Sequence, residues 1–164
     1  MKKNLTVARI LLIALALFTQ IGCSSAGETK AEEKDKTPKA SVSGSKLEHL
    51  TYATFLDKIW NFEEHPQEWV YKSELPAIID FYADWCAPCK RIAPIMEKLA
   101  KTYEGRIRIY KINVDNERKL ASVFKVQSIP AVLFTPLKGQ PMMQAGALTE
   151  EMYVKIIEEQ LLKK

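Results

Sequence analysis

Trp85-Cys86-Ala87-Pro88-Cys89-Lys90 is the stretch of this sequence that decides the fold. An apolar run, residues 77–82, precedes it, and apolar residues recur at helical spacing from Ile92 to Tyr103 after it. The first pattern predicts a strand buried on both faces, and the second predicts an amphipathic helix. The sequence therefore predicts a pair of cysteines carried from the end of a strand into the start of a helix.

Composition limits the classes of function that this chain can have. The net charge is +4, but Lys2, Lys3 and Arg9 supply three of these charges, and residues 1–22 contain no acidic residue. From Leu47 onward, 16 Lys and Arg balance 16 Asp and Glu, so no basic surface indicates nucleic acid as a partner. Three cysteines are too few for a disulfide scaffold, and a pair three residues apart indicates redox or metal chemistry.

The N-terminal segment has the pattern of a signal peptide, which we assign to residues 1–22. Basic residues precede an apolar stretch of nine residues, 10–18, which is too short to cross a bilayer core that needs about 20. The following residues, 21–25, resemble a bacterial lipobox, in which the chain is cut before a cysteine that receives lipid. This interpretation makes Cys23 the lipidation site. Gln20 stands where that motif usually has Leu, so cleavage by ordinary signal peptidase near residues 24–26 is the alternative.

A polar tether and one domain follow the signal. Residues 23–46 contain Ser, Gly, Lys, Glu, Ala and Thr and almost no bulky aliphatic residue, so we expect a flexible tether. Residues 47–164 form the predicted domain, an α/β fold with a mixed sheet flanked by helices. Its expected elements are a helix from Tyr52, a short strand around Trp69 and Tyr71, a strand at 77–82, a helix at 86–103, a strand at 106–114, a helix at 116–124, a hairpin of 131–134 and 141–144, and a final helix capped by Thr149 with Met152, Ile156, Ile157 and Leu161 on its buried face.

From Leu47 to the C-terminus the chain resembles the thioredoxin family. The matching motifs are residues 80–90 around the two cysteines, Pro94, Lys111 within residues 110–115, residues 128–130 (Ser-Ile-Pro), and Gly146 within residues 145–147. Ala87 stands where most members carry Gly, and Tyr82 stands where many carry Trp. The resemblance implies the thioredoxin fold, and it does not cover residues 60–74.

The cysteine pair is the predicted catalytic centre. A thiolate attacks a disulfide, and the N-terminus of a helix stabilises negative charge. Lowering a thiol pKa from about 8.5 to about 7 raises the thiolate fraction at neutral pH from roughly 3% to roughly 50%, although lower nucleophilicity removes much of that gain. We expect an exposed Cys86 as the nucleophile, a buried Cys89 that resolves the mixed disulfide, and a redox disulfide between them. The alternatives are two packing residues or half of a metal site, but no second cysteine pair exists and the two histidines lack ligand spacing.

Two charged residues on the predicted strands join the cysteines as catalytic candidates. A carboxylate inside an apolar strand costs several kcal/mol unless it is paired or protonated, so Asp80 needs an explanation. The resemblance implies that Asp80 lies beneath the dithiol and helps to remove the proton of the resolving cysteine, with Lys111 on the neighbouring strand as its partner. The alternatives are an Asp80 at a strand edge with access to water and a Lys111 that only reaches solvent.

A docking surface for substrates follows from the same resemblance. Proline before an apolar strand usually marks the start of the strand, and spacing alone predicts a trans bond. The resemblance instead implies a cis Ile129–Pro130 bond beside the dithiol, where the Ile129 backbone can pair with a substrate strand. The expected substrate-binding residues are Pro130 and an apolar rim of Trp85, Ala87, Pro88, Ile129, Gly146 and Ala147. For Trp85 the alternative is ordinary packing.

These observations predict a thioredoxin-type protein-disulfide oxidoreductase. Asp80 and the Ala87-Pro88 dipeptide resemble reducing members, because strongly oxidising members usually have His in place of Pro88. We expect a monomeric reductase of disulfide-containing proteins without cofactor or metal, in the periplasm or at an extracytoplasmic membrane face. It would be held by a lipid anchor and reduced by a membrane electron-transfer protein. The alternatives are an oxidase or isomerase of folding proteins, and a redox-inactive binding module or chaperone that uses only the rim.

Overall fold

The structure, a computed structural model, describes residues 47–163. The predicted signal peptide, the tether and the lipidation site Cys23 therefore lie outside the described residues. No helix in the described part is both long enough and apolar enough to cross a membrane.

A five-stranded mixed sheet forms the centre of the domain, in the order β1-β3-β2-β4-β5. The strands are β1 (Glu48–His49), β2 (Ala77–Tyr82), β3 (Arg108–Asn113), β4 (Ala131–Thr135) and β5 (Met142–Ala145). β3 is parallel to β1 and β2, whereas β4 is antiparallel to β2 and β5. This arrangement confirms the predicted mixed sheet and the hairpin. β1 was not predicted, because two exposed residues have no periodicity to detect.

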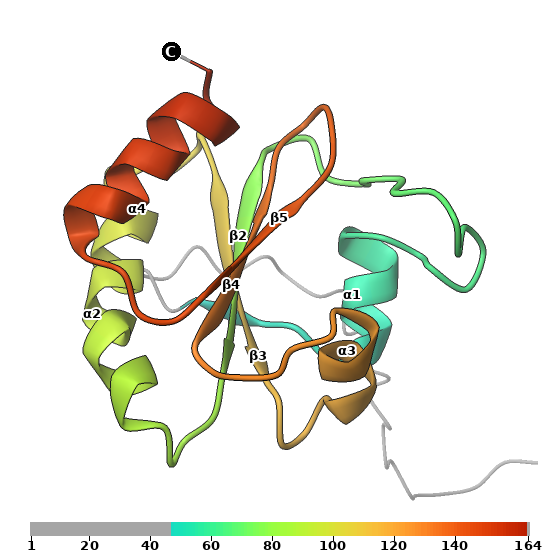
Figure 1. The fold of residues 1–164 in the computed structure, drawn as a ribbon. Coiled ribbons are helices and arrows are strands. Elements are labelled where there is room, and N and C mark those ends of the chain that lie inside the picture. Colours follow the sequence, from blue (N-terminus) through green and yellow to red (C-terminus); the bar gives the residue numbers. More distant parts are fainter. Residues whose placement is uncertain (1–46, 164) are drawn as a thin grey trace, which may run out of the picture. The chain divides into compact units, whose positions relative to one another are not determined.

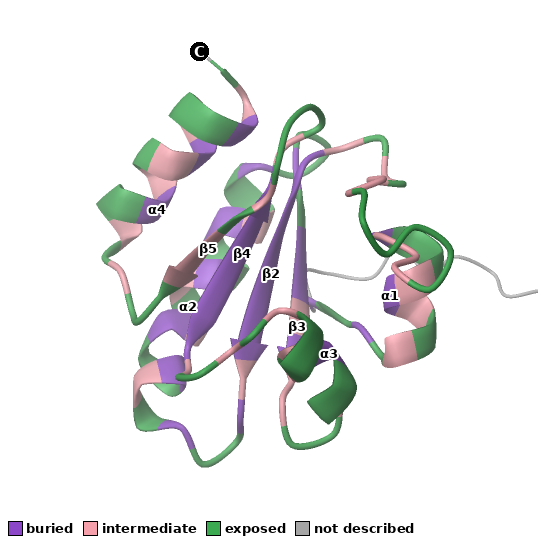
Figure 2. Ribbon diagram, turned by 45° about the vertical axis from the view of Figure 1, so that its right-hand side comes forward, coloured by how far each residue is buried: buried purple, intermediate pink, exposed green. Residues whose placement is uncertain are grey.

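Helices cover both faces of the sheet. α1 (Tyr52–Lys58) and α3 (Arg118–Val123) lie on one side, and α2 (Ala87–Thr102) and α4 (Glu150–Ile156) lie on the other (Figure 1). β2 is in the middle and is buried on both faces, as its apolar run predicted (Figure 2). Ile78 packs with Ile92 and Met96 of α2, whereas its neighbour Ile79 packs with Phe55 and Leu120 on the other side. Alternation along β2 therefore directs Asp80, two residues after Ile78, toward the α2 side.

The C-terminal helix is capped by Thr149, whose side chain accepts a hydrogen bond from the backbone N–H of Met152. The helix continues as a π-helical turn, η1 (Ile157–Leu161). Ile157 and Leu161 are buried, as predicted, but the prediction for Met152 is wrong because its side chain is 49% exposed. The next residue of α4, Tyr153, is the one that packs on the sheet, against Phe134.

The segment after α1 contains no strand, so the predicted strand around Trp69 and Tyr71 is wrong. The two rings stack on each other, with centroids 6.1 Å apart, in a segment without regular secondary structure. Trp69 also packs against Trp60 and against Phe124 at the end of α3. Aromatic packing between distant segments therefore sets the conformation here, and alternation in the sequence does not report it.

Candidate functional site: a dithiol at the start of α2

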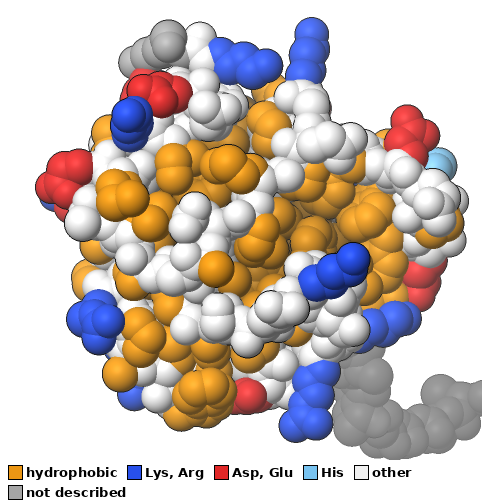
Figure 3. All heavy atoms as spheres, in the orientation of Figure 1, with side chains coloured by type: hydrophobic (Ala, Val, Ile, Leu, Met, Phe, Trp, Pro, Cys, Tyr) orange, Lys and Arg blue, Asp and Glu red, His pale blue; other side chains and the backbone are white. Residues whose placement is uncertain are grey.

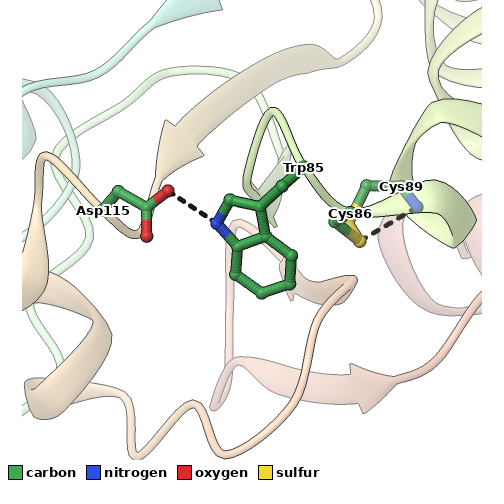
Figure 4. Close-up of a disulfide and its surroundings, with 4 residues drawn as sticks. All are labelled: Trp85, Cys86, Cys89 and Asp115. Atoms are coloured by element: carbon green, nitrogen blue, oxygen red, sulfur yellow. Dashed lines mark hydrogen bonds between the residues drawn. A yellow bond between two sulfur atoms is a disulfide. The ribbon is translucent and has the colours of Figure 1, made fainter.

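Cys86 and Cys89 form a disulfide at the N-terminus of α2, with their Cα atoms 5.3 Å apart. Cys86 is the N-cap residue of the helix, and its Sγ accepts a hydrogen bond of 3.2 Å from the backbone N–H of Cys89 (Figure 4). Pro88 lies in the first turn of the helix. A backbone N–H at this position would have no partner within the helix, so proline, which lacks the N–H, fits there without losing a hydrogen bond. The helix start therefore directs a backbone donor and the positive end of its dipole toward Cys86 Sγ, which stabilises a thiolate there.

Both cysteines are buried, which corrects the expectation of an exposed Cys86 above a buried Cys89. Each is only 3% exposed, and both pack against Ala83 and Ile129. In the disulfide form each sulfur covers the other, so exposure does not distinguish the two residues. The difference between them lies in the backbone, because Cys86 caps the helix and Cys89 lies inside its first turn.

Asp80 is fully buried in the middle strand of the sheet, which excludes a strand-edge position with access to water. Neither carboxylate oxygen has a hydrogen-bond partner among the described residues. Burial raises the pKa of this carboxyl from 3.8 to about 6, and the positive charge of Lys111 opposes part of that rise. Asp80 therefore changes its charge close to neutral pH, on the side of the sheet that α2 covers.

Lys111 lies directly opposite Asp80 on the neighbouring strand, as the sequence predicted. The two side chains form no ion pair within residues 47–163. The Lys111 ammonium instead lies 4.1 Å from the centre of the Tyr82 ring, in a cation–π contact. Lys111 is thus half-buried within the sheet and acts on Asp80 through its charge, without a direct hydrogen bond.

Replacing Lys111 by Met should raise the pKa of Asp80 above about 6, because the substitution removes the positive charge that lowers it. Lys111→Arg keeps the charge and is the matched control, for which we expect an unchanged pKa. NMR titration of the Asp80 carboxyl carbon in the disulfide form measures both values. An equal pKa in Lys111→Met and the native protein would show that the carboxyl does not respond to this charge.

The structure brings the two distant segments of the predicted rim next to the dithiol. The Ile129–Pro130 bond is cis, and Ile129 packs against the cysteines. Gly146 donates its backbone N–H to the Pro130 carbonyl at 2.8 Å, and its φ of 87° lies in the region that favours glycine. Pro130 is buried, so its side chain adds no exposed surface to the rim.

The remaining rim residues are at or near the surface. Trp85 is 70% exposed, so the alternative of ordinary packing is excluded. Ala87 and Ala147 are exposed, and Pro88 is half-buried. Exposure of a large indole beside the disulfide is costly in water, and it makes this surface suitable for contact with another protein.

Sequence reasoning missed five residues that hold this site together. The Trp85 indole N–H donates to Asp115 at 2.9 Å, which fixes the ring (Figure 4). Asn113 donates to Asp84 and accepts from the backbone N–H of Asp115. On the other side of Lys111, Tyr82 Oη and His49 Nδ1 are 3.2 Å apart. Asp115 and Asn113 stand in a motif that the sequence singled out, but their partners depend on strand register, which the sequence does not reveal.

Comparisons with known proteins agree with this geometry. The family model described as Thioredoxin matches residues 58–159. A thioredoxin of Borreliella burgdorferi is 43% identical over 110 residues, which are 67% of this chain and 93% of that protein. The chloroplastic M-type thioredoxin of Spinacia oleracea is 48% identical over 68 residues, which are 42% of this chain and 38% of that protein. A crystal structure of chloroplastic thioredoxin z shares the fold, with a TM-score of 0.55 and 23% identity over 68% of this chain and 91% of that one.

Proposed function

This chain belongs to the thioredoxin family of protein-disulfide oxidoreductases, and from that premise we propose that it is an extracytoplasmic reductase of protein disulfides. The proposal adds a direction of electron flow, a location and an order of action for the two cysteines. The observation that carries it is a helix-capping cysteine in a disulfide, on the side of the sheet where Asp80 is buried without a partner.

Each cysteine has one step in the proposed reaction. The Cys86 thiolate attacks one sulfur of a substrate disulfide, and the other substrate sulfur leaves as a thiolate. Cys89 then gives its proton to the Asp80 carboxylate and attacks Cys86 Sγ, so that the second substrate sulfur leaves and the Cys86–Cys89 disulfide forms. The substrate gains two electrons, and the chain must be reduced again before the next cycle.

A pKa of about 6 suits Asp80 to the second step. At pH 7 the carboxyl is mostly ionised and can accept a proton, yet it is a much stronger base than an exposed carboxylate. Its negative charge, on the side of the sheet that α2 covers, would also disfavour a persistent thiolate and so favour the disulfide form over the dithiol. A chain that returns readily to its disulfide form is a reductant, because it passes its electrons on to the substrate.

The exposed rim gives the substrate a place to dock. A substrate strand beside Ile129 would lie next to the disulfide, with the Trp85 indole and the alanines of the rim in contact with it. Backbone pairing does not depend on side-chain identity, so we expect many disulfide-bonded proteins to be accepted.

The proposed location rests on residues 1–23, which have the pattern of a signal followed by a lipidated cysteine. Outside the cytoplasm disulfides persist, and no soluble reductant is abundant there. The reductase would therefore need a membrane protein that carries electrons across the bilayer to the Cys86–Cys89 disulfide. Anchoring through Cys23 would keep the domain close to such a donor.

Replacing Cys23 by Ser should release the protein from the membrane, because serine cannot form the thioether that carries the lipid. Metabolic labelling with a fatty acid, followed by membrane fractionation, measures the effect in cells that process lipoproteins. The matched control is Ser24→Ala, which should remain labelled and in the membrane fraction. Equal fractionation of Cys23→Ser and the native chain would contradict the anchor but not the redox chemistry.

A further inference from the structure

A concave site lies apart from the dithiol. We call it the aromatic hollow and define it by Trp60, Trp69, Val123, Phe124, Leu133 and Met143. Its volume is about 350 Å³, and none of the residues lining it belongs to the rim around the disulfide. Apolar side chains gather in this hollow on the face that Figure 3 shows, beside β5 (Figures 1 and 3).

The segment after α1, which the family resemblance left unexplained, forms one wall of the aromatic hollow. Its rings pack closely, with the Trp60 and Trp69 centroids 5.0 Å apart. The Trp60 N–H donates to the Glu68 carbonyl at 2.8 Å, whereas the shielded Trp69 N–H has no acceptor among the described residues. Buried indole N–H groups usually have a partner, so the wall contains one donor that the described residues leave unpaired.

The size and charge of the aromatic hollow limit what it can hold. Pockets for small molecules and cofactors have volumes of about 300–1,000 Å³, so this one suits a single large side chain with its flanking backbone. Glu68 and Lys125 at its border carry opposite charges, so the hollow selects neither sign. An uncharged apolar side chain fits both limits.

The opposite border of the aromatic hollow is an open strand edge. β5 is the last strand of the sheet, and in the part of the chain that the structure describes nothing pairs with its outer side. The backbone N–H of Gly146 donates to the Pro130 carbonyl of the neighbouring segment. Backbone groups alternate along an antiparallel strand, so the N–H and C=O of Gln144 also point toward β4. The N–H and C=O groups of Met143 and Ala145 point outward, away from β4. The Gln144 side-chain amide donates to the Ala145 carbonyl, as expected for a group that β4 does not use.

We propose that the aromatic hollow and the outer edge of β5 together bind an extended segment of a partner polypeptide, which adds to the sheet as a strand and inserts one large apolar side chain. Residues paired across neighbouring strands project from the same face of the sheet. The partner residue opposite Met143 therefore projects beside the Met143 side chain, into the aromatic hollow. Main-chain bonds to Met143 supply affinity for any strand, and the aromatic hollow selects the inserted residue. The proposal does not depend on disulfide exchange.

The test uses fluorescein-labelled, cysteine-free peptides that alternate Thr and Val around one central guest residue. Fluorescence anisotropy with the full chain in its disulfide form measures their affinities. Peptides with Leu or Phe as the guest should bind at least about tenfold more tightly than peptides with Lys, because the hollow would bury an unpaired charge. Equal affinities for all guests would overturn the proposal, and so would the absence of binding.

Matched variants locate the peptide. Val123→Lys places a charged side chain at the border of the aromatic hollow and should weaken binding of the Leu peptide about tenfold. The matched control is Met152→Lys, at an exposed position of α4, which should not weaken binding. Met143→Pro removes an outward N–H without removing a bond to β4, and should weaken binding by a similar factor. If Trp85→Ala abolished peptide binding and Val123→Lys left it unchanged, the peptide would bind at the dithiol rim, and the proposal would be overturned. A dimer of the free protein that Val123→Lys dissociates would identify a second copy as the occupant, which also overturns it.

Discussion

Replacing Cys86 by Ser should reduce the rate of protein-disulfide reduction to the uncatalysed rate. Serine has no thiolate at neutral pH and cannot form the mixed disulfide through which exchange proceeds. Reduction of insulin disulfides by dithiothreitol, with and without the protein, measures the loss. A Cys86→Ser variant that still accelerates the reaction would show that Cys86 is not the nucleophile.

Cys89→Ser is the matched variant, because it removes the same sulfur from the other position. It should still attack through Cys86 but cannot resolve the product, so mixed disulfides with substrate proteins should accumulate. Mass spectrometry of these complexes identifies the cysteine that carries the substrate. Complexes linked through Cys89 in a Cys86→Ser variant, and not through Cys86 in Cys89→Ser, would reverse the order of the two cysteines.

Replacing Asp80 by Asn should make the folded protein, with its disulfide intact, more stable against unfolding at pH 7.5, while it slows the resolving step. The Asp80 pKa is 3.8 in the unfolded chain and about 6 in the folded one, so the native protein loses stability as the pH rises through this range. The shift of roughly two pKa units corresponds to roughly 3 kcal/mol of folding free energy, which the native protein loses above about pH 6. An uncharged Asn at this position does not lose it. Urea unfolding should therefore show a difference between the proteins that grows from pH 4 to pH 7 and then stays constant.

The kinetic effect of Asp80→Asn has the opposite sign. Without a base near Cys89 the resolving step should slow by about a hundredfold, the lower end of what a general base contributes, while the first attack stays nearly unchanged. Asp57→Asn is the control: this exposed carboxylate lies in α1, outside the site, and its replacement should change stability by less than about 0.5 kcal/mol. An equal loss in both steps would contradict the role of Asp80 as proton acceptor.

The candidate catalytic and substrate-binding residues could be predicted from the sequence because each one breaks a local pattern. Asp80 interrupts an apolar run, two cysteines stand where a helix begins, and Pro130 precedes a buried strand. The structure places the cysteines at the start of α2, Asp80 in the middle strand of the sheet, and Ile129 of the cis Ile129–Pro130 bond against the cysteines. A continuous apolar run predicted β2, because this strand is buried on both faces. Apolar residues at helical spacing predicted α2, because this helix is buried on one face.

Long-range packing set the features that the sequence did not reveal. Trp69 and Tyr71 alternate in the sequence like residues of a strand, but no strand forms there. Their rings stack on each other, and the Trp69 ring also makes an edge-on contact with Phe124, which lies more than fifty positions later. Met152 and Tyr153 are neighbours in the last helix, and the contact of Tyr153 with Phe134 decides which one is buried. Burial of Cys86 depends on the disulfide and on Ile129, neither of which spacing alone determines.

The reduction potential of the Cys86–Cys89 pair tests the proposed reductase most directly. Equilibration of the purified protein with defined ratios of reduced and oxidised dithiothreitol or glutathione, followed by trapping of free thiols, gives this value. A reductase of this family should have a potential near that of thioredoxin, about −270 mV. A value near about −120 mV, typical of a strong periplasmic oxidant, would contradict the proposal and make the chain a donor of disulfides.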